Sequence, residues 1–600
     1  MGVGEWRGRY GAGLMGDETA FLGVESSVLG RRWMGPDAAL QRLTDAMAQT
    51  TRLPRAVCAV LSRSGVPPEG AEDYLAPSLR ALLPDPRGLR DMERAAARLL
   101  AAVDGAEKIA VFADYDVDGG ASAALVICWL RAMGHVATLY IPDRIDEGYG
   151  PNVPAMETLA QTHDLIICVD CGTVSHDPIA AARGADVMVV DHHLGTETLP
   201  PAYAVVNPNR QDETGDLGHL CAAGVVFLLL VEANRQLRAR GRQGPDLMAF
   251  LDLVALATVA DVAPLIGVNR AFVRQGLRVM SARSRVGLRA LADVARLEAA
   301  PTAYHLGFVL GPRVNAGGRI GAADLGARLL ASDDPVEAEA LAERLELLNA
   351  ERREIEAAVR AEAMAQAQAR GAEGALVWAA GDGWHPGVIG IAAARLKESL
   401  ARPAIVIGLD GDEGKGSGRS VPGIDLGAAV QRLVREGLLL KGGGHRMAAG
   451  LTVARGQIET AMERLSELLA QQGAGSAGAA SDLRIDSALM PGAVTVELIE
   501  QLETAGPFGA AAPAPRFAFP DMRIQSLRRM GETHLRLRFG DGESNSLEAV
   551  AFGAFESELG PALATAQGTR LHLAGKVEIN QWGGRRSVQL RLDDAAVPNS

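Results

Sequence analysis

The chain has 600 residues, of which 48% are apolar and 22% are charged, and its formal net charge at pH 7 is −13. A chain of this length exceeds the size at which one hydrophobic core keeps growing, so we expect several domains, and the composition is that of a folded globular protein. The acidic balance argues against a surface that binds nucleic acid throughout, which leaves that role to local basic clusters.

No segment predicts a membrane span or a disulfide framework. The longest apolar run with helical character, at 225–231, is far shorter than the ~20 residues that a membrane span needs, and the start of the chain does not resemble a signal peptide, so we expect a cytoplasmic protein. The five cysteines are odd in number and lie mostly in apolar segments. Cys168 and Cys171 form a C-x-x-C, but no second pair completes a zinc site.

The first half of the chain predicts an α/β domain. Residues 1–75 form an N-terminal extension whose function the sequence does not indicate, and 76–100 has helical spacing. From residue 108, short apolar runs alternate with helical stretches such as 121–133, a pattern typical of a parallel sheet with helices on its faces. The expected strands are 109–113, 137–141, 165–169 and 187–190. We therefore predict a Rossmann-like domain over 76–330.

The second half predicts three further parts. Leu341, Leu345 and Leu348 recur at helical spacing, so 331–371 is expected to form a long connecting helix. A second α/β domain over 372–472 is followed by a linker and joint over 473–518, which begins with small residues. Residues 519–598 predict a β-barrel of the OB type, with strands at 533–539, 547–552, 570–577 and 587–592.

Potential metal ligands follow four of these elements directly. Carboxylates follow the first and third strands, a D-H-H triplet follows the fourth strand, and an aspartate ends the apolar helix at 251–260. The residues are Asp114, Asp116, Asp118, Asp170, Asp191, His192, His193 and Asp261. Because the carboxyl ends of parallel strands meet at one edge of a sheet, we expect these side chains to form one site.

The ligand types indicate a metal-dependent hydrolase. Aspartate oxygens favour Mg²⁺ and imidazole shifts the preference toward Mn²⁺, and five or more ligands suggest two ions. Two ions can activate water and stabilise an in-line displacement at phosphorus, which predicts phosphoester hydrolysis. The sequence contains neither a G-x-x-x-x-G-K-[ST] phosphate loop nor a G-x-S-x-G nucleophile turn. Residues 114–119 also match the start of an EF-hand loop, but Leu125 stands where that loop needs a bidentate Glu.

The chain resembles the DHH phosphoesterase superfamily in four motifs. They are D-Y-D-V-D-G at 114–119, V-D-C-G at 169–172, D-H-H at 191–193 and A-T-V-A-D-V at 257–262. Within the superfamily it is similar to the RecJ family of single-strand-specific 5′ to 3′ exonucleases over residues 70–598. The motifs that carry this similarity are P-D-R at 142–144, E-G-Y-G at 147–150, G-P-R-V-N-A-G-G-R at 311–319 and G-S-G-R-S at 416–420. G-G-G-H at 442–445 with A-A-G at 448–450 resembles the DHHA1 domain, so the resemblance implies a DHH domain, a DHHA1 domain and an OB-fold.

The resemblance also implies a role for each site residue. The metal ligands would be Asp114, Asp116, Asp170, His192 and Asp261. Asp170 would bridge the ions, His193 would contact a metal or the scissile phosphate, and Asp118 and Asp191 would orient the ligands. The 5′ phosphate and DNA would be bound by Arg144, Arg313, Ser417, Arg419 and His445. Guanidinium groups suit a terminal phosphate, although a structural ion pair is an equal alternative for either of the first two arginines.

The implied function is hydrolysis of single-stranded DNA from its 5′ end to 5′-mononucleotides, in DNA recombination and repair. Single-strand-binding protein would be a partner, and the chain is expected to be a monomer. Basic residues at 527–538 and 584–586 would serve a DNA-binding barrel or be solvated strand faces. Two alternatives stay open: a phosphodiesterase for short RNA or cyclic dinucleotides, which would not need the barrel, and a replication scaffold without catalysis, which would lack ligands. Ala512 stands where the family usually has Asn before Pro, which affects only the joint.

Overall fold

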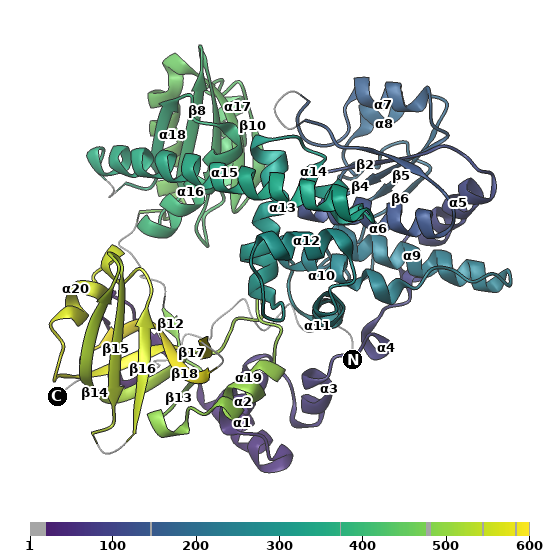
Figure 1. Ribbon diagram of the computed structural model, residues 1–600. Helices are drawn as coiled ribbons and strands as arrows, with labels where there is room; N and C mark the ends of the chain where they lie inside the picture. Colours follow the sequence, from purple (N-terminus) through teal and green to yellow (C-terminus); the bar gives the residue numbers. More distant parts are fainter. Residues whose placement is uncertain are drawn as a thin grey trace. The chain divides into compact units, whose positions relative to one another are not determined.

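The computed structural model describes residues 20–143, 147–371, 374–475, 482–542, 545–582 and 585–598 (Figure 1). The chain divides into two compact units. The terminal unit takes its described residues from Met1–Leu83, Pro264–Ala271 and Ala479–Ser600, and the central unit takes its own from Pro84–Ala263 and Phe272–Gly478. Among the described residues, every helix is too short or too polar to span a lipid bilayer.

The central unit begins with a five-stranded parallel sheet in the order β3-β2-β4-β5-β6. Its strands are β2 (Ile109–Ala113), β3 (Ala137–Tyr140), β4 (Leu165–Val169), β5 (Asp186–Val190) and β6 (Ala204–Val206). Helices α5 (Met92–Asp104), α6 (Val117–Ala132) and α9 (Ala222–Ala239) pack on one face, and α7 (Val153–Ala160) with α8 (His176–Ala181) on the other (Figure 1). Because both faces are covered, every residue of β2 and β4 is buried, which explains their unbroken apolar sequences.

The prediction for this sheet is confirmed in type and nearly in its limits. The strands expected at 109–113 and 165–169 match β2 and β4, and the other two differ by one residue. Two elements differ from the prediction. The three-residue β6 was missed, and α6 begins at Val117 rather than at 121 because Asp116 accepts the backbone N–H groups of Asp118 and Gly119 and so caps the helix.

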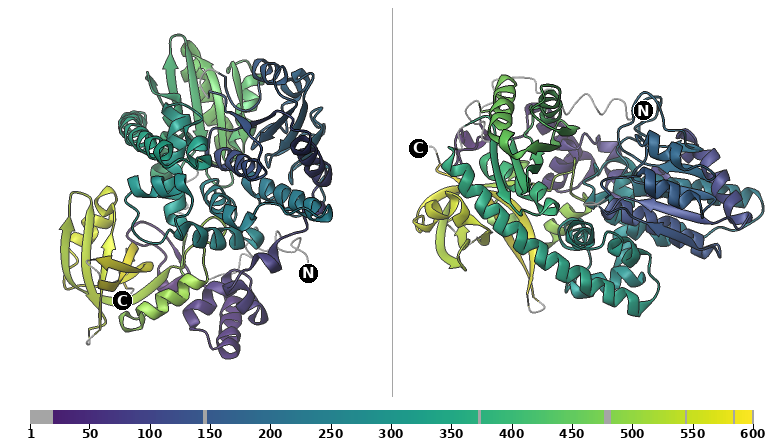
Figure 2. Two further views of the ribbon diagram at one scale, coloured as in Figure 1. Left: turned by 45° about the vertical axis from the view of Figure 1, so that its right-hand side comes forward. Right: turned by 90° about the horizontal axis from the view of Figure 1, so that it is seen from above.

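A helical layer separates this sheet from a second one. It contains α10 (Leu251–Ala260), α11 (Gly267–Ser281), α12 (Val286–Val294), the π-helical η6 (His305–Leu310), α13 (Gly311–Ile320), α14 (Leu325–Ala331) and α15 (Pro335–Ala369). The long connecting helix expected at 331–371 is α15, which the right-hand view of Figure 2 shows along its length. It packs on α12, α13 and α14 in one half and on α16 (Pro386–Leu400) and β7 (Val377–Asp382) in the other.

The second sheet has the order β10-β11-β9-β8-β7, with only β7 and β8 parallel. Its strands are β7 (Val377–Asp382), β8 (Ala404–Asp410), β9 (Glu413–Arg419), β10 (Lys441–His445) and β11 (Ala448–Ala454). Helices α16 (Pro386–Leu400), α17 (Leu426–Arg435) and α18 (Ile458–Gln471) cover it. This arrangement confirms the second α/β fold.

The terminal unit contains a closed five-stranded barrel, which confirms the OB-type fold. Strands β14 (Phe517–Met530), β15 (His534–Gly540), β16 (Ser546–Ala551), β18 (Arg585–Ala596) and β17 (Arg570–Trp582) pair in this order, and β17 pairs back with β14. Strand β14 was not predicted from the sequence. The first residues of this strand fall within the predicted joint at 473–518, and its last residues fall within the basic cluster at 527–538. Short β12 (Leu483–Arg484) and β13 (Ser487–Ala488), α19 (Val496–Thr504) and α20 (Leu559–Ala564) complete this part.

The N-terminal extension belongs to the same unit. Its described elements include β1 (Trp33–Met34), α1 (Ala38–Thr51), α2 (Arg55–Arg63) and α3 (Ala71–Leu75), and α4 (Leu79–Leu82) follows the extension in the same unit. Strand β1 pairs in parallel with β12, and Val57 and Leu61 of α2 share one hydrophobic core with Phe517 and Phe519 of β14. Strand β1 and helix α2 thus pack against the part of the chain that forms the barrel.

Candidate metal centre

The predicted ligands converge at the carboxyl edge of the parallel sheet. Asp114 follows β2, Asp170 follows β4, the D-H-H triplet follows β5, and Asp261 is the C-cap of α10. Three groups have ligand atoms within 4.8 Å of one another: Asp114 with Asp116 and Asp170, Asp170 with His192 and His193, and Asp118 with His192 and Asp261. The sequence prediction that these elements build one site agrees with this geometry.

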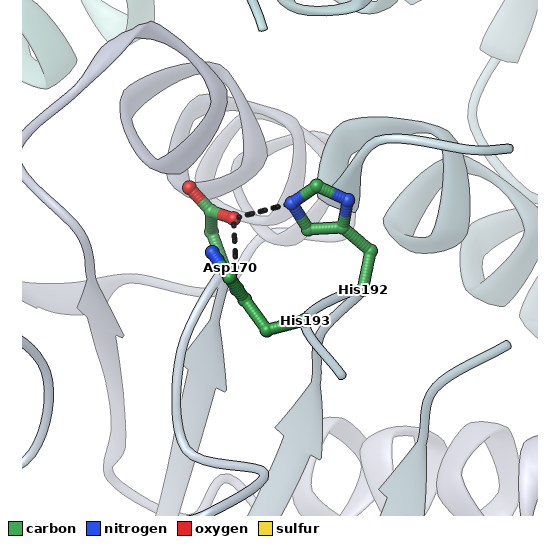
Figure 3. A group of neighbouring side chains, drawn as sticks. All are labelled: Asp170, His192 and His193. Atoms are coloured by element: carbon green, nitrogen blue, oxygen red, sulfur yellow. Dashed lines mark ion pairs between the residues drawn. The ribbon is translucent and has the colours of Figure 1, made fainter. Parts of the chain in front are cut away.

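Asp170 and His192 each belong to two of the three groups. Oδ1 of Asp170 lies 3.3 Å from Nε2 of His192 and 3.9 Å from Nδ1 of His193 (Figure 3). Asp170 is buried and has a φ of +59°, a left-handed conformation that aspartate tolerates better than most residues. This backbone conformation turns its carboxylate toward both histidines.

His192 is oriented to offer a ring nitrogen to a cation. Its Nδ1 lies 3.2 Å from the carbonyl oxygen of Leu220, which can only accept, so Nδ1 donates and Nε2 is the nitrogen that faces the carboxylates. That Nε2 lies 3.8 Å from an oxygen of Asp118 and 3.9 Å from one of Asp261. A cation placed between Nε2 and these oxygens would be coordinated by all of them.

The protonation equilibria also favour a cation. Burial and the neighbouring carboxylates raise the pKa of Asp170 well above its usual value, and burial raises the pKa of Asp118. Burial together with the charges of Asp118 and Asp116 raises the pKa of Asp261 to about 8. Buried carboxylates at such short distances cannot all be ionised without a compensating positive charge. The donor set of aspartate oxygens and imidazole nitrogen fits Mn²⁺ or Mg²⁺.

Asp191 lies outside the three ligand groups and holds the histidines. Its Oδ1 accepts from Nδ1 of His193 at 2.8 Å and from the backbone N–H groups of His192 and His193, and its Oδ2 accepts from the N–H of Thr173. Burial opposes a charged imidazole, but the hydrogen bond to Asp191 and the surrounding negative charges raise the pKa of His193 to about 9.

Asp118 connects the centre to α9. Its two carboxylate oxygens accept the N–H groups of Ala222 and Ala223 at 2.7 and 2.8 Å, so it caps the first turn of that helix. These contacts agree with the orienting roles expected for Asp118 and Asp191, although an oxygen of Asp118 also lies within ligand distance of His192 and Asp261.

Three asparagines that the sequence did not single out hold the loops of the centre. Asn207 donates from Nδ2 to the carbonyl oxygen of His193 and to Oγ1 of Thr173, both at 2.8 Å, and Asn209 donates to the carbonyl oxygen of His192 at 2.6 Å. Asn315 accepts the N–H of Val117 at 3.0 Å. Two signals could have revealed them: N-P-N directly follows the apolar run of β6, and Asn315 lies within the 311–319 motif.

The structure describes four of the five residues that were predicted to bind the 5′ phosphate and DNA. Arg144 falls outside the described residues. Arg313 on α13 forms a two-pronged ion pair with Glu346 of α15, which is the structural alternative considered above. Ser417 and Arg419 share a face of β9 and are joined by a 3.1 Å hydrogen bond, and His445 is exposed at the end of β10.

Comparison with known proteins identifies the family. Three family models match the chain: "DHH family, N-terminal domain" at 108–258, "DHHA1 domain" at 373–471 and "RecJ OB domain" at 485–594. The single-stranded-DNA-specific exonuclease RecJ of Dickeya dadantii is 39% identical over 541 residues, covering 86% of this chain and 92% of the relative. The chain belongs to the RecJ family.

Solved RecJ structures share the fold of this chain and contain the expected ions. The structure of RecJ from Thermus thermophilus in complex with Mn²⁺ covers 95% of this chain and 80% of its own, with a TM-score of 0.78 and 29% identity. The Mg²⁺ complex of RecJ from the same organism has a TM-score of 0.72, with 28% identity over 95% of this chain and 79% of its own. Both ions expected from the sequence are thus bound by a relative with the same fold.

Proposed function

We propose that this chain is a metal-dependent exonuclease that hydrolyses single-stranded DNA from the 5′ end and releases 5′-mononucleotides. The observation that carries the proposal is the set of three ligand groups linked by Asp170 and His192, in a chain of the RecJ family. All aspartates and histidines of the four superfamily motifs are present, which argues against a scaffold without catalysis.

Each residue of the centre has a defined task in this proposal. Asp114, Asp116, Asp170, His192 and Asp261 would hold two Mn²⁺ or Mg²⁺ ions, with Asp170 between them. When bound, the ions supply an activated water and charge stabilisation for in-line displacement at phosphorus. His193 is half-exposed beside the ligands, and its positive charge, kept by Asp191, suits a contact with the scissile phosphate.

The second half of the chain would select the substrate. Ser417 and Arg419 offer a hydroxyl and a guanidinium for a terminal phosphate, with His445 as a further contact. Within the barrel, Arg528 and Arg538 are exposed on neighbouring strands, which suits the DNA backbone, whereas Arg536 and Arg586 are already paired with Glu548 and Glu500.

A phosphodiesterase for short RNA or cyclic dinucleotides could use the same ligands, but such an enzyme would not need the C-terminal barrel. We extend the proposal to a role in DNA recombination and repair, to single-strand-binding protein as a partner, and to a monomeric state. These follow from the resemblance, and each needs its own experiment.

The test is an end-labelled degradation assay. Single-stranded oligonucleotides that carry a label at the 5′ or the 3′ end are incubated with Mn²⁺ or Mg²⁺ and with wild type or Asp170→Ala. We expect labelled mononucleotide to appear first from the 5′ end and the variant to be inactive. Asp333→Ala, which removes a carboxylate that is 73% exposed, is the matched control and should retain activity. Equal attack on both ends, or a preference for dinucleotides, would refute the proposal.

A further inference from the structure

Two aromatic side chains of the central unit are stacked on each other and exposed to solvent. Tyr304 is 57% exposed and Phe308 is 71% exposed, and their ring centroids lie 5.2 Å apart with an angle of 26° between the planes. They are four residues apart on continuous helical backbone, so they lie on the same side. We call this pair the aromatic platform. Clustered apolar surface marks binding sites more often than single exposed apolar side chains do.

The backbone under the aromatic platform is held in place. Phe308 lies in η6, a π-helical segment, and such segments are rare and occur often at functional sites. Arg313 donates to the carbonyl oxygen of Val309 at 2.6 Å and is itself fixed by Glu346 of α15. At the other end, Nδ1 of His305 accepts the N–H of Thr302 at 3.0 Å. The two rings are therefore preformed for binding.

The helical segment that carries the aromatic platform packs against the helix that ends at a candidate metal ligand. Gly307 and Gly311 face the last turn of α10, where added Cβ atoms would lie 3.4 Å from Val259 and 3.3 Å from Ala260, and Asp261 follows directly. The segment then runs into α13, whose Asn315 holds the loop of Asp116. The same two helices thus support the rings and the metal ligands.

We propose that Tyr304 and Phe308 form a stacking site for one base of the single-stranded DNA substrate beside the metal centre. The inference rests on the proposed function. A base offers a flat, uncharged face to a ring whatever its sequence, which suits an enzyme that degrades any strand. Bases in a duplex are already stacked on both sides, so the site also favours single strands.

The test combines ring removal with base removal. Degradation rates are measured on oligonucleotides with all bases and on a series with one abasic position moved stepwise from the 5′ end. For Phe308→Ala and for the double variant with Tyr304→Ala, we expect KM to rise about fivefold or more with little change in kcat. An abasic unit at one position should raise the wild-type KM by a similar factor and should have no further effect on the variants. A merely structural role would not produce this loss of sensitivity.

Two further variants keep the test specific. Phe308→Trp retains a stacking face and should bind as well as wild type, whereas Phe308→Leu retains only apolar bulk and should resemble the alanine variant. Val336→Ala removes another exposed apolar side chain, 76% exposed on α15, and should behave as wild type.

Other outcomes would overturn the inference. If Phe308→Ala loses activity equally on all abasic substrates, or dissociates a dimer in size-exclusion chromatography, the rings serve the fold or a second copy of the chain. If wild type degrades single strands and every variant matches it, only the aromatic platform is refuted. If wild type degrades no single-stranded DNA, the proposed function itself fails.

Discussion

Replacing Asn207 with alanine tests whether a buried amide outside the ligand set positions the metal centre. Asn207 is fully buried, and besides its two bonds to Thr173 and His193 its Oδ1 accepts the N–H of Asn209 at 2.7 Å. The substitution therefore removes three hydrogen bonds and leaves buried partners unpaired.

The structure sets the size of the effect. Each lost bond costs about 0.5 to 1.5 kcal/mol net, so we expect the free energy of unfolding of the central unit to fall by about 2 to 4 kcal/mol, which an ordinary domain survives. The carbonyl of His193 also loses its anchor, and losing an outer contact of a metal site typically lowers metal affinity or turnover by about 10- to 100-fold.

The assay pairs urea unfolding, followed by circular dichroism, with single-turnover degradation of single-stranded DNA over a range of Mn²⁺ concentrations. The matched control is Asn234→Ala in the same unit. Asn234 accepts from Nε1 of Trp129 at 3.0 Å and donates to the carbonyl oxygen of Pro245 at 2.7 Å, and it lies roughly 18 Å along α9 from the capped end. We expect the control to lose stability and keep its turnover. Wild-type turnover in a destabilised Asn207→Ala would refute the reasoning.

Three further predictions concern other parts of the fold. In Gly119→Ala the added Cβ would lie 2.4 Å from the carbonyl oxygen of Asp114, so we expect turnover to fall about 100-fold. The control is Gly120→Ala, whose added Cβ meets only ordinary contacts at 3.5 Å or more. Equal turnover rates for the two variants would contradict this prediction. Asp261→Asn removes one of the crowded carboxylates, so we expect it to raise the melting temperature of protein freed of metal by a chelator. The rise in melting temperature on addition of Mn²⁺ should be smaller than in wild type, and an equal rise would argue against Asp261 as a ligand. Arg270→Lys removes hydrogen bonds of 3.0 Å to two backbone carbonyls in the terminal unit, so we expect the free energy of unfolding of that unit to fall by about 2 kcal/mol or more. Limited proteolysis of the terminal unit should therefore be faster than in wild type. An unchanged rate of proteolysis would show that the arginine is dispensable.

The convergence of the candidate ligands could be predicted from the sequence because each of them is placed by its own strand or helix. Each ligand directly follows an apolar strand or helix, and parallel strands bring their carboxyl ends to one edge without further information. The exact strand limits of β2 and β4 follow from burial on both faces, which leaves unbroken apolar runs. Motif resemblance then assigned the roles that spacing alone leaves open.

The missed features depend on contacts between distant residues. Asn315 binds the backbone of Val117, and no local pattern indicates that pairing. Arg313 illustrates the same limit, because its partner Glu346 lies on another helix, so the sequence could not decide between a phosphate ligand and an ion pair. Strand β14 was missed because polar residues interrupt its second half, where only one face is covered.

The shared core of β1, α2 and the barrel has a consequence for synthesis. Trp33 pairs with Leu483, about 450 residues further along the chain, so the segment that contains β1 cannot complete its fold until β12 has been synthesised. At about 5 to 20 residues per second this delay is roughly 20 to 90 seconds, during which the apolar side of α2 lacks its final partner. The central unit does not wait for the barrel, because its own segments are all translated before residue 479. Deleting the codons of β1 and α2 would therefore damage a barrel that is encoded several hundred codons further downstream.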